Sequence, residues 1–243
     1  MSEDRPNESA STEDFEFKAL QEAVNYRQSL LDEFGPWLRG SVIEIGAGIG
    51  QLTGGLAGAP GVQRLLPVEP DDRFVEAFRR SHPGRELLVG TAADIPPGQT
   101  WNALVSVNVL EHIRDDEAEL ALWGSLLRPA SGHLCLFVPA RPEIYAPLDK
   151  DFGHFRRYTK PELRQKLEAA GYEVVRLCYF NFIGYFAWWA SFVLLGQRSF
   201  KAASVRLFDR LIFPWAHGLE KSVCRPPLGQ SLLAIAKAGQ SPS

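Results

Sequence analysis

The chain has 243 residues, of which 45% are hydrophobic and 23% charged, and its formal net charge is -3. This length suits one domain with an elaboration, and the weakly acidic balance gives no electrostatic reason to expect nucleic acid as a partner. Cys135, Cys178 and Cys224 lie far apart without a C-x-x-C pair, which argues against a disulfide framework or a zinc site and favours a reducing cytoplasm.

The N-terminal part predicts a leader followed by a helical cap. Residues 1–14 are acidic and Ser-rich and lack an apolar stretch, so we expect a disordered leader and not a signal peptide. Residues 15–243 are predicted to form a single domain. Apolar residues then recur at helical intervals from Phe15 to Phe34, where Gly35-Pro36 ends the pattern. A helical cap over residues 15–40 follows from this.

After the cap, short apolar runs alternate with helical patterns. Two helices are predicted, from Asp71 to Ser81 and from Asp115 to Leu127, each with acids at its N-terminus. The predicted strands are Val42 to Ile45, Gln63 to Val68, Glu86 to Val89, Ala103 to Val107 and His133 to Val138. This alternation predicts an α/β fold in which a mostly parallel sheet is covered by helices on both faces.

The last third predicts a helix, a strand, a helical insertion and a final strand. Thr159 and Glu162 form a capping box for a helix that ends at Gly171, and the strand "YEVVRLCYF" follows. Within an insertion over residues 182–228, helices are expected at Phe182 to Leu195 and near Ala203 to Phe213. The uncharged stretch from Leu177 to Gln197 is long enough to span a bilayer. We favour an insertion instead, because the final strand in "GQSLLAIAKA" must return to the same sheet.

The first strand runs into a glycine loop. In "VIEIGAGIGQLT", Glu44 precedes glycines at positions 46, 48 and 50, which permit a tight turn and close approach of a ligand to the backbone. A dinucleotide fingerprint would place the third glycine one residue later, so the spacing favours S-adenosylmethionine over NAD. Glu69, at the end of the second strand, is expected to bind the ribose hydroxyls.

Four segments in order resemble a known family. "VIEIGAGIG", "VEP", "GTAADIP" and "LVSVNVLEHIRDD" are similar to motifs I to IV of the class I S-adenosylmethionine-dependent methyltransferases, in the branch that includes ubiquinone-biosynthesis enzymes. The resemblance covers residues 41–138, the predicted cofactor-binding core. It implies a Rossmann-like, seven-stranded, mostly parallel sheet with the helical cap at its start and the helical insertion before the last strand.

The resemblance also implies roles for individual residues. Gly46 and Gly48 would face the methionine part of the cofactor, and Asn108 with Val109 would line the sulfonium side. Ala93 and Asp94 would lie at the adenine. Since Gly90-Thr91-Ala92 stands where relatives often have Gly-Asp-Ala, the adenine contact would pass to Asp94 or to backbone N–H groups. The full predicted cofactor set is Glu44, Gly46, Ala47, Gly48, Gly50, Glu69, Pro70, Ala93, Asp94, Asn108 and Val109.

The acceptor site is expected beyond the carboxyl ends of the fourth and fifth strands, with residues 139–158 as an active-site loop. His112 and His154 are candidate general bases, and each has the alternative of a structural histidine. Tyr158 is a third catalytic candidate. The predicted substrate-binding residues are Tyr145, Arg156, Arg157 and Trp188.

The two arginines could clamp an anionic acceptor, or one could pair with Asp149 or Asp151 while the other is solvated. Arg27 on the cap is a candidate for the methionine carboxylate. No group with metal-ligand spacing is found in the sequence, so no metal is predicted.

The predicted reaction is methyl transfer from S-adenosylmethionine to a small molecule, saccharide or lipid-linked acceptor. A hydroxyl is the favoured acceptor group, ahead of a nitrogen, a carboxylate or a carbon. The alternatives are a nicotinamide-dependent oxidoreductase or epimerase, and a catalytically silent methyltransferase-like domain that binds a partner. The aromatic insertion could be a satellite core, a roof over the acceptor, a homodimer face or a membrane-surface contact. Residues for a membrane contact are Trp188, Trp189, Trp215, Arg198, Lys201, Arg206 and Arg210.

Overall fold

The computed structural model describes residues 21–199, 202–222 and 226–239. Its centre is a seven-stranded sheet in the order β3-β2-β1-β4-β5-β7-β6, in which only β7 runs antiparallel to its neighbours. The predicted mostly parallel sheet is thereby confirmed. The strands are β1 Gly40–Ile45, β2 Val62–Glu69, β3 Leu88–Val89, β4 Ala103–Val107, β5 His133–Pro139, β6 Tyr172–Phe180 and β7 Ser231–Ala238.

Helices cover both faces of this sheet. The α-helices are α2 Val24–Phe34, α3 Thr53–Ala57, α4 Asp72–Ser81, α5 Asp116–Leu127, α6 Pro147–Asp151, α7 Lys160–Ala169, α8 Phe182–Trp188, α9 Ala202–Leu207 and α10 Phe213–Ser222. Short 3-10 helices are η1 Gly35–Trp37, η2 Ala92–Asp94, η3 Leu110–His112, η4 Arg128–Ala130 and η5 Pro142–Ile144. Two π-helical segments, η6 Trp189–Leu194 and η7 Phe208–Ile212, lie within the insertion.

The two hydrophobic layers follow from alternation along buried strands. Leu134 and Leu136 of β5 point to the face covered by α5 and α7, whereas Cys135 and Phe137 point to the face covered by α2 and α3. Successive side chains of a strand lie on opposite faces, so a strand buried on both sides reads as an unbroken apolar run. This explains why "LCLFVP", after His133, is apolar throughout.

The predicted helix starts are confirmed by their caps. Asp71 and Asp115 accept hydrogen bonds from the backbone N–H groups of Arg73 and Ala118, at 2.9 Å and 3.0 Å. The Thr159 hydroxyl accepts one from the Glu162 N–H, and the Glu162 carboxylate accepts one from the Thr159 N–H, which completes the capping box. Side chains that satisfy first-turn N–H groups fix where each helix begins.

The helical cap is present, but it is interrupted within the described residues, since Gln21 and Glu22 are helical and Ala23 is not. The backbone at Ala23 departs from helical geometry, and α2 starts at Val24. The predicted leader, the first residues of the predicted cap helix, Lys201 and Cys224 lie outside the described residues. The chain enters the sheet through Gly40, and the buried side chains of Leu30 and Phe34 fix α2 against it.

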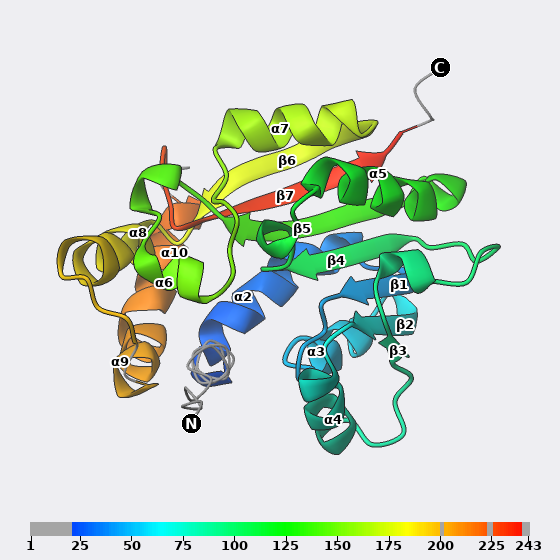
Figure 1. The fold of residues 1–243 in the computed structure, drawn as a ribbon, viewed down its shortest axis with the longest axis horizontal. Coiled ribbons are helices and arrows are strands. Elements are labelled where there is room, and N and C mark those ends of the chain that lie inside the picture. Colours follow the sequence, from blue (N-terminus) through cyan, green and yellow to red (C-terminus); the bar gives the residue numbers. More distant parts are fainter. Residues whose placement is uncertain (1–20, 200–201, 223–225, 240–243) are drawn as a thin grey trace, which may run out of the picture.

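The insertion between β6 and β7 is more helical than expected. Its first helix continues from α8 into η6, and its second runs through α9, η7 and α10 to Ser222 instead of ending near Phe213. No helix in the described ranges has the length and apolar character needed to cross a bilayer. Figure 1 shows α6, α8, α9 and α10 gathered at the end of the sheet to which the arrows of β4 and β5 point.

Candidate active site

The glycine loop after β1 requires glycine at three positions. Gly46, Gly48 and Gly50 have φ values of 73°, 54° and 86°, a region that residues with a Cβ rarely occupy. A Cβ on Gly46 would also lie only 2.3 Å from Cγ2 of Val109. The loop after β1 and the segment after β4 therefore meet directly. Ala47, between Gly46 and Gly48, is buried, and its N–H donates to the Val68 carbonyl.

Glu69 lies at the end of β2 beside this loop. Its Oε2 accepts a 2.7 Å hydrogen bond from the Gly48 N–H, and its Oε1 accepts a 3.0 Å bond from the Asp71 N–H. Burial raises the pKa of Glu69, and the two backbone bonds oppose that rise. Each carboxylate oxygen can accept a second hydrogen bond, so both remain able to receive a ribose hydroxyl.

Glu44 is buried and stabilises the glycine loop through a hydrogen bond inside the protein. Its Oε2 accepts a 2.6 Å hydrogen bond from the Thr53 hydroxyl, at the first residue of α3. Burial raises the pKa of Glu44 to about 8, and the Thr53 bond lowers it only in part. The structure thus gives Glu44 a partner within the protein, and its contribution to the predicted cofactor site is to hold β1 against the start of α3.

The predicted adenine residues lie at the exposed rim after β3. Asp94 accepts hydrogen bonds from the Thr91 N–H and hydroxyl, at 2.8 Å and 3.0 Å, so it caps its own short helix. These bonds lower the pKa of Asp94. Ala93 and Pro70 are both exposed. The edge of the predicted cofactor site is therefore open at this end.

Asn108 marks the point where β4 ends and the acceptor side begins. It adopts the left-handed conformation with φ at 53°, unusual for a residue other than glycine, and its N–H donates to the Phe137 carbonyl at 2.9 Å. Strained backbone of this kind recurs at functional sites. Asn108 also lines a cavity of about 800 Å³ that extends from the end of β4 to the insertion.

This cavity is large enough for an acceptor. It is bounded by Tyr26 of the cap, by His154 and Arg157 of the loop after β5, and by Trp188 and Phe208 of the insertion. A volume of this order holds a drug-sized or larger organic molecule. Residues of the insertion therefore line this cavity, which is the geometry expected of a roof over the acceptor.

His154 stands on the cavity wall with a carboxylate partner. Its Nδ1 lies 3.0 Å from Oδ1 of Asp149, and both side chains are buried. Burial acts to raise the pKa of Asp149, but contacts with His154 and Arg157 outweigh burial and keep that pKa low. Asp149 was absent from the predicted site. Its only sequence signal was its acidic side chain near two arginines.

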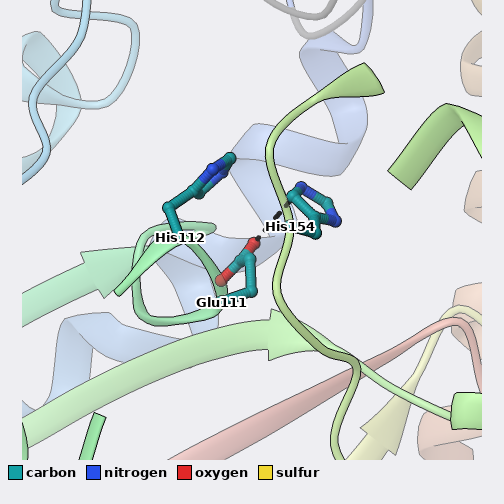
Figure 2. Close-up of side chains that lie close together, drawn as sticks. All are labelled: Glu111, His112 and His154. Carbon is teal, nitrogen blue, oxygen red and sulfur yellow. Dashed lines mark ion pairs between the residues drawn. The ribbon is translucent and has the colours of Figure 1, made fainter. Parts of the chain in front are cut away.

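Glu111, His112 and His154 come together although they derive from separate segments. One ligand atom of each lies within 4.8 Å of the others, and Nε2 of His154 lies 4.0 Å from Oε1 of Glu111. Figure 2 shows the three side chains converging from the segment after β4 and from the loop after α6. The expectation that no group has metal-ligand spacing is thus wrong, because the fold assembles what the linear sequence separates.

Burial governs the ionisation of His112. Burial, together with repulsion from His154, lowers the pKa of His112 to about 4, so the imidazole is neutral at pH 7. The two rings are nearly perpendicular, with centroids 4.7 Å apart. Both histidines predicted as catalytic candidates therefore lie at one place.

Tyr158 and Arg156 are placed elsewhere than predicted. The Tyr158 hydroxyl is buried and donates to Asp116 at 2.9 Å, and burial raises its pKa. Nη1 of Arg156 also pairs with Asp116, at 2.7 Å. Neither side chain lines the cavity described above. The structure therefore does not support Tyr158 as a catalytic residue or Arg156 as an anion clamp, because the Tyr158 hydroxyl and the Arg156 guanidinium both bind Asp116.

Arg157 follows the alternative in which an arginine pairs with Asp149. Its Nε and Nη2 each lie 2.8 Å from Oδ1 of Asp149, and its guanidinium lies 4.5 Å from the centre of the Trp188 ring. Trp188 in turn donates from Nε1 to the Ile144 carbonyl at 3.0 Å. The Tyr145 hydroxyl donates to the His154 carbonyl at 2.7 Å. These residues hold His154 in place, and Arg157 is not a free anion clamp.

The sequence matches a family of known chemistry. The family described as "Methyltransferase domain" matches residues 18–177, which is more than half of the chain. The chain belongs to this family. The methyltransferase thus uses S-adenosylmethionine, in agreement with its glycine loop and Glu69. The alternative of a nicotinamide-dependent oxidoreductase or epimerase is excluded. No relative was found among functionally curated proteins. The narrower resemblance to ubiquinone-biosynthesis enzymes stays a prediction.

Solved structures share the fold at low identity. A Haloferax volcanii methyltransferase, solved with the Trm112 activator, is 16% identical over 98% of this chain and 100% of that chain, with a TM-score of 0.64. A Bacillus halodurans methyltransferase is 17% identical over 86% and 97%, with a TM-score of 0.58. An Archaeoglobus fulgidus enzyme described as S-adenosylmethionine-dependent is 18% identical over 89% and 94%, with a TM-score of 0.57.

Proposed function

We propose that the methyltransferase transfers a methyl group to a hydroxyl of an amphiphilic acceptor bound in the cavity under the insertion. The observation that carries this proposal is the Asp149–His154 pair, 3.0 Å apart on the cavity wall. A hydroxyl must lose its proton as it attacks the sulfonium methyl, and a carboxylate-oriented imidazole is suited to assist. Neutral His112 beside it keeps the site from accumulating positive charge.

The cavity lining supports an acceptor with apolar and polar parts. Its walls carry the aromatic rings of Tyr26, Phe152, Trp188, Phe192 and Phe208. Polar groups at the same wall include Asn108, Asn181, Gln230 and Ser231. Aromatic walls bind an apolar body, and a few amides and hydroxyls orient it. A saccharide or lipid-linked hydroxyl compound fits this pattern.

The first test is cofactor binding by the full chain. Calorimetric titration should show S-adenosylhomocysteine binding and no NAD binding. Radiolabelled S-adenosylmethionine is then incubated with a panel of hydroxyl, amine and carboxyl acceptors that carry alkyl or aromatic groups. Methylation confined to hydroxyls, with a loss of about 100-fold or more in His154→Gln, supports the proposal, since general acid–base assistance contributes about 10²–10⁴-fold.

A specific control separates catalysis from folding. In Asp149→Asn the imidazole loses its charged partner while the side chain keeps its shape, so turnover should fall with cofactor affinity unchanged. Transfer to amines only would contradict the O-methylation. Cofactor binding without transfer to any acceptor, in cells as well as in vitro, would favour the catalytically silent alternative.

The outer face of the insertion supports a peripheral membrane contact. Trp215 is 80% exposed, Leu195 68% and Arg198 68% in its side chain. The acids Asp209 and Glu220 bond backbone N–H groups of the protein. The other large apolar residues exposed here are Ile183, Phe186, Trp189, Val193, Leu194, Leu207, Leu211, Ile212 and Leu219. Exposed aromatics beside arginines suit an anionic lipid surface.

Vesicle flotation tests this contact. The protein should float with vesicles that contain anionic phosphatidylglycerol and less with phosphatidylcholine alone, and Trp215→Ser with Leu219→Ser should abolish flotation. Val24→Ser, which alters an exposed apolar residue on α2, should not. If the unaltered protein does not bind vesicles but forms concentration-dependent dimers in sedimentation, and the double variant does not dimerise, the face belongs to a homodimer instead.

A further inference from the structure

Two imidazoles and one carboxylate form a compact ligand set beside the cavity. Glu111, His112 and His154 each place one donor atom within 4.8 Å of the others, and Glu111 is fully buried. Figure 2 shows the Glu111 carboxylate close to both imidazoles, with the dashed line joining it to His154. Among the described residues this is the one group with donors so close together. The set meets the cavity at His154.

The orientation of His154 resembles that of a metal-bound histidine. Its Nδ1 faces Asp149 at 3.0 Å, which leaves Nε2 directed toward Oε1 of Glu111 at 4.0 Å. Histidines that bind metals usually donate their other ring N–H to a carboxylate or carbonyl, which fixes the ring and raises its basicity. Arg157 contacts the same Oδ1 of Asp149, and the Ala146 N–H donates to Oδ2 at 2.8 Å, so both oxygens of the carboxylate that orients His154 have partners within the protein.

We propose that Glu111, His112 and His154 bind one divalent transition-metal ion of the zinc class. Nitrogen-rich donor sets favour zinc and its neighbours, whereas magnesium and calcium require mainly oxygen ligands. Three protein ligands leave a coordination position for water or substrate, as in catalytic zinc sites.

This inference rests on the proposed hydroxyl methylation and assigns His154 the role of holding the ion that activates the hydroxyl, in place of direct proton transfer to its imidazole. The acceptor oxygen completes the coordination, and the ion lowers the pKa of the hydroxyl so that its proton leaves to solvent water. The oxygen lone pair then forms the new C–O bond as the C–S bond of the sulfonium breaks. The sulfur keeps that electron pair and leaves as neutral S-adenosylhomocysteine, so charge and atoms balance without an oxidant.

The test measures metal binding directly on the full chain. The protein is stripped with a chelator and titrated with Zn²⁺, Co²⁺ and Mg²⁺, with bound metal measured by equilibrium dialysis and Co²⁺ also by visible absorption. We expect one equivalent of Zn²⁺ or Co²⁺, intense ligand-field bands for Co²⁺ and no comparable Mg²⁺ binding. Glu111→Gln, His112→Ala and His154→Ala should each weaken binding by more than about 100-fold, beyond the 10–100-fold typical of outer-shell changes.

A histidine elsewhere provides the matched control. His217 also lies near carboxylates, with Nε2 4.0 Å from Glu33 and Nδ1 3.8 Å from Glu220, but no second histidine of the described chain joins it in such a ligand group. His217→Gln should leave metal binding unchanged. Binding that survives all three ligand variants, or that disappears in His217→Gln alone, would overturn the assignment.

Metal binding and hydroxyl methylation, measured separately, distinguish the two proposals. If S-adenosylhomocysteine binds and His154→Gln abolishes hydroxyl methylation, yet no Zn²⁺ or Co²⁺ binds to the ligand set, the metal inference fails and the proposed function stands. If the metal binds but no hydroxyl acceptor is ever methylated, the proposed function fails. The ligand variants are checked for folding by thermal unfolding and by their S-adenosylhomocysteine affinity.

Discussion

The Asp209 carboxylate caps the N-terminus of α2 from the opposite end of the chain. Oδ1 accepts a hydrogen bond from the Tyr26 N–H and Oδ2 one from the Asn25 N–H, both at 2.9 Å. These are first-turn N–H groups of α2, which lack partners within the helix. The cap and the insertion are therefore joined by one buried side chain.

Removal of this carboxylate should destabilise the fold and loosen α2. In Asp209→Ala we expect a loss of about 0.5–2 kcal/mol in the free energy of unfolding, the range for lost helix caps. Urea unfolding measures it, and hydrogen exchange should accelerate at Asn25 and Tyr26. Asp32→Ala, at an exposed acid of the same helix, should change stability by less than about 0.5 kcal/mol. Equal effects of the two substitutions would contradict the capping role.

Gly46 should be intolerant of a Cβ. Gly46→Ala places a methyl group 2.3 Å from Val109 and forces alanine into the left-handed region, which by itself costs about 1–2 kcal/mol. Since the loop must move, S-adenosylhomocysteine affinity in calorimetry should fall at least tenfold. Gly58→Ala is the matched control, because its Cβ would come no closer than 3.4 Å to the Gly54 carbonyl. Unchanged affinity in Gly46→Ala would refute the close approach of the loop.

Stability should depend on pH through Glu44. The pKa of Glu44 is about 8 in the folded protein, compared with an ordinary value of 4.5. Between pH 4.5 and pH 8 the folded state therefore binds more protons at this residue than the unfolded state does. Stability is then fullest below pH 4.5 with respect to this group. It declines as pH rises toward 8, by up to about 1.4 kcal/mol per unit. Urea unfolding at pH 6 and 8.5 should show this decline, and Glu44→Gln should flatten it. An identical slope in both proteins would exclude Glu44 as its source.

Trp188 should be important for stability, in contrast to its neighbour in sequence. It is 6% exposed, stacks on Arg157 and donates to Ile144, whereas Trp189 is 43% exposed. Trp188→Ala should cost about 3–5 kcal/mol, the range for large aromatic truncations in a core. Trp189→Ala should cost much less, as measured by denaturant unfolding. A larger loss of stability in Trp189→Ala than in Trp188→Ala would contradict the packing of Trp188 against the loop after β5.

The parts of the fold that depend on local patterns could be predicted from sequence. Strand β5 reads as an apolar run, and Asp71, Asp115 and Thr159 mark helix starts, because each signal needs only neighbouring residues. The glycine loop and Glu69 were found for the same reason. Their positions next to each other after β1 and β2 follow from the parallel sheet.

The acceptor side could not be predicted in the same detail. Asp209 bonds Asn25 across 184 positions, and Glu111 meets His154 only because β4 and β5 are neighbours in the sheet. The sequence offers Arg156 and Arg157 as equals, yet tertiary packing gives one to Asp116 and the other to Asp149. Choices between chemically identical partners are made by the fold, which local patterns do not contain.

The two ends of the insertion are clasped to each other. The Gln230 N–H donates to the Asn181 carbonyl at 3.1 Å, and the Asn181 side-chain amide donates to Oε1 of Gln230 at 2.8 Å. These two hydrogen bonds fix the ends of β6 and β7 next to each other, whatever residues lie between them. We therefore expect that the insertion can be exchanged between relatives as one segment, provided that the Asn181–Gln230 pair and an acid equivalent to Asp209 are transferred with it. Acceptor preference would then travel with this segment, while the cofactor end of the enzyme remains untouched.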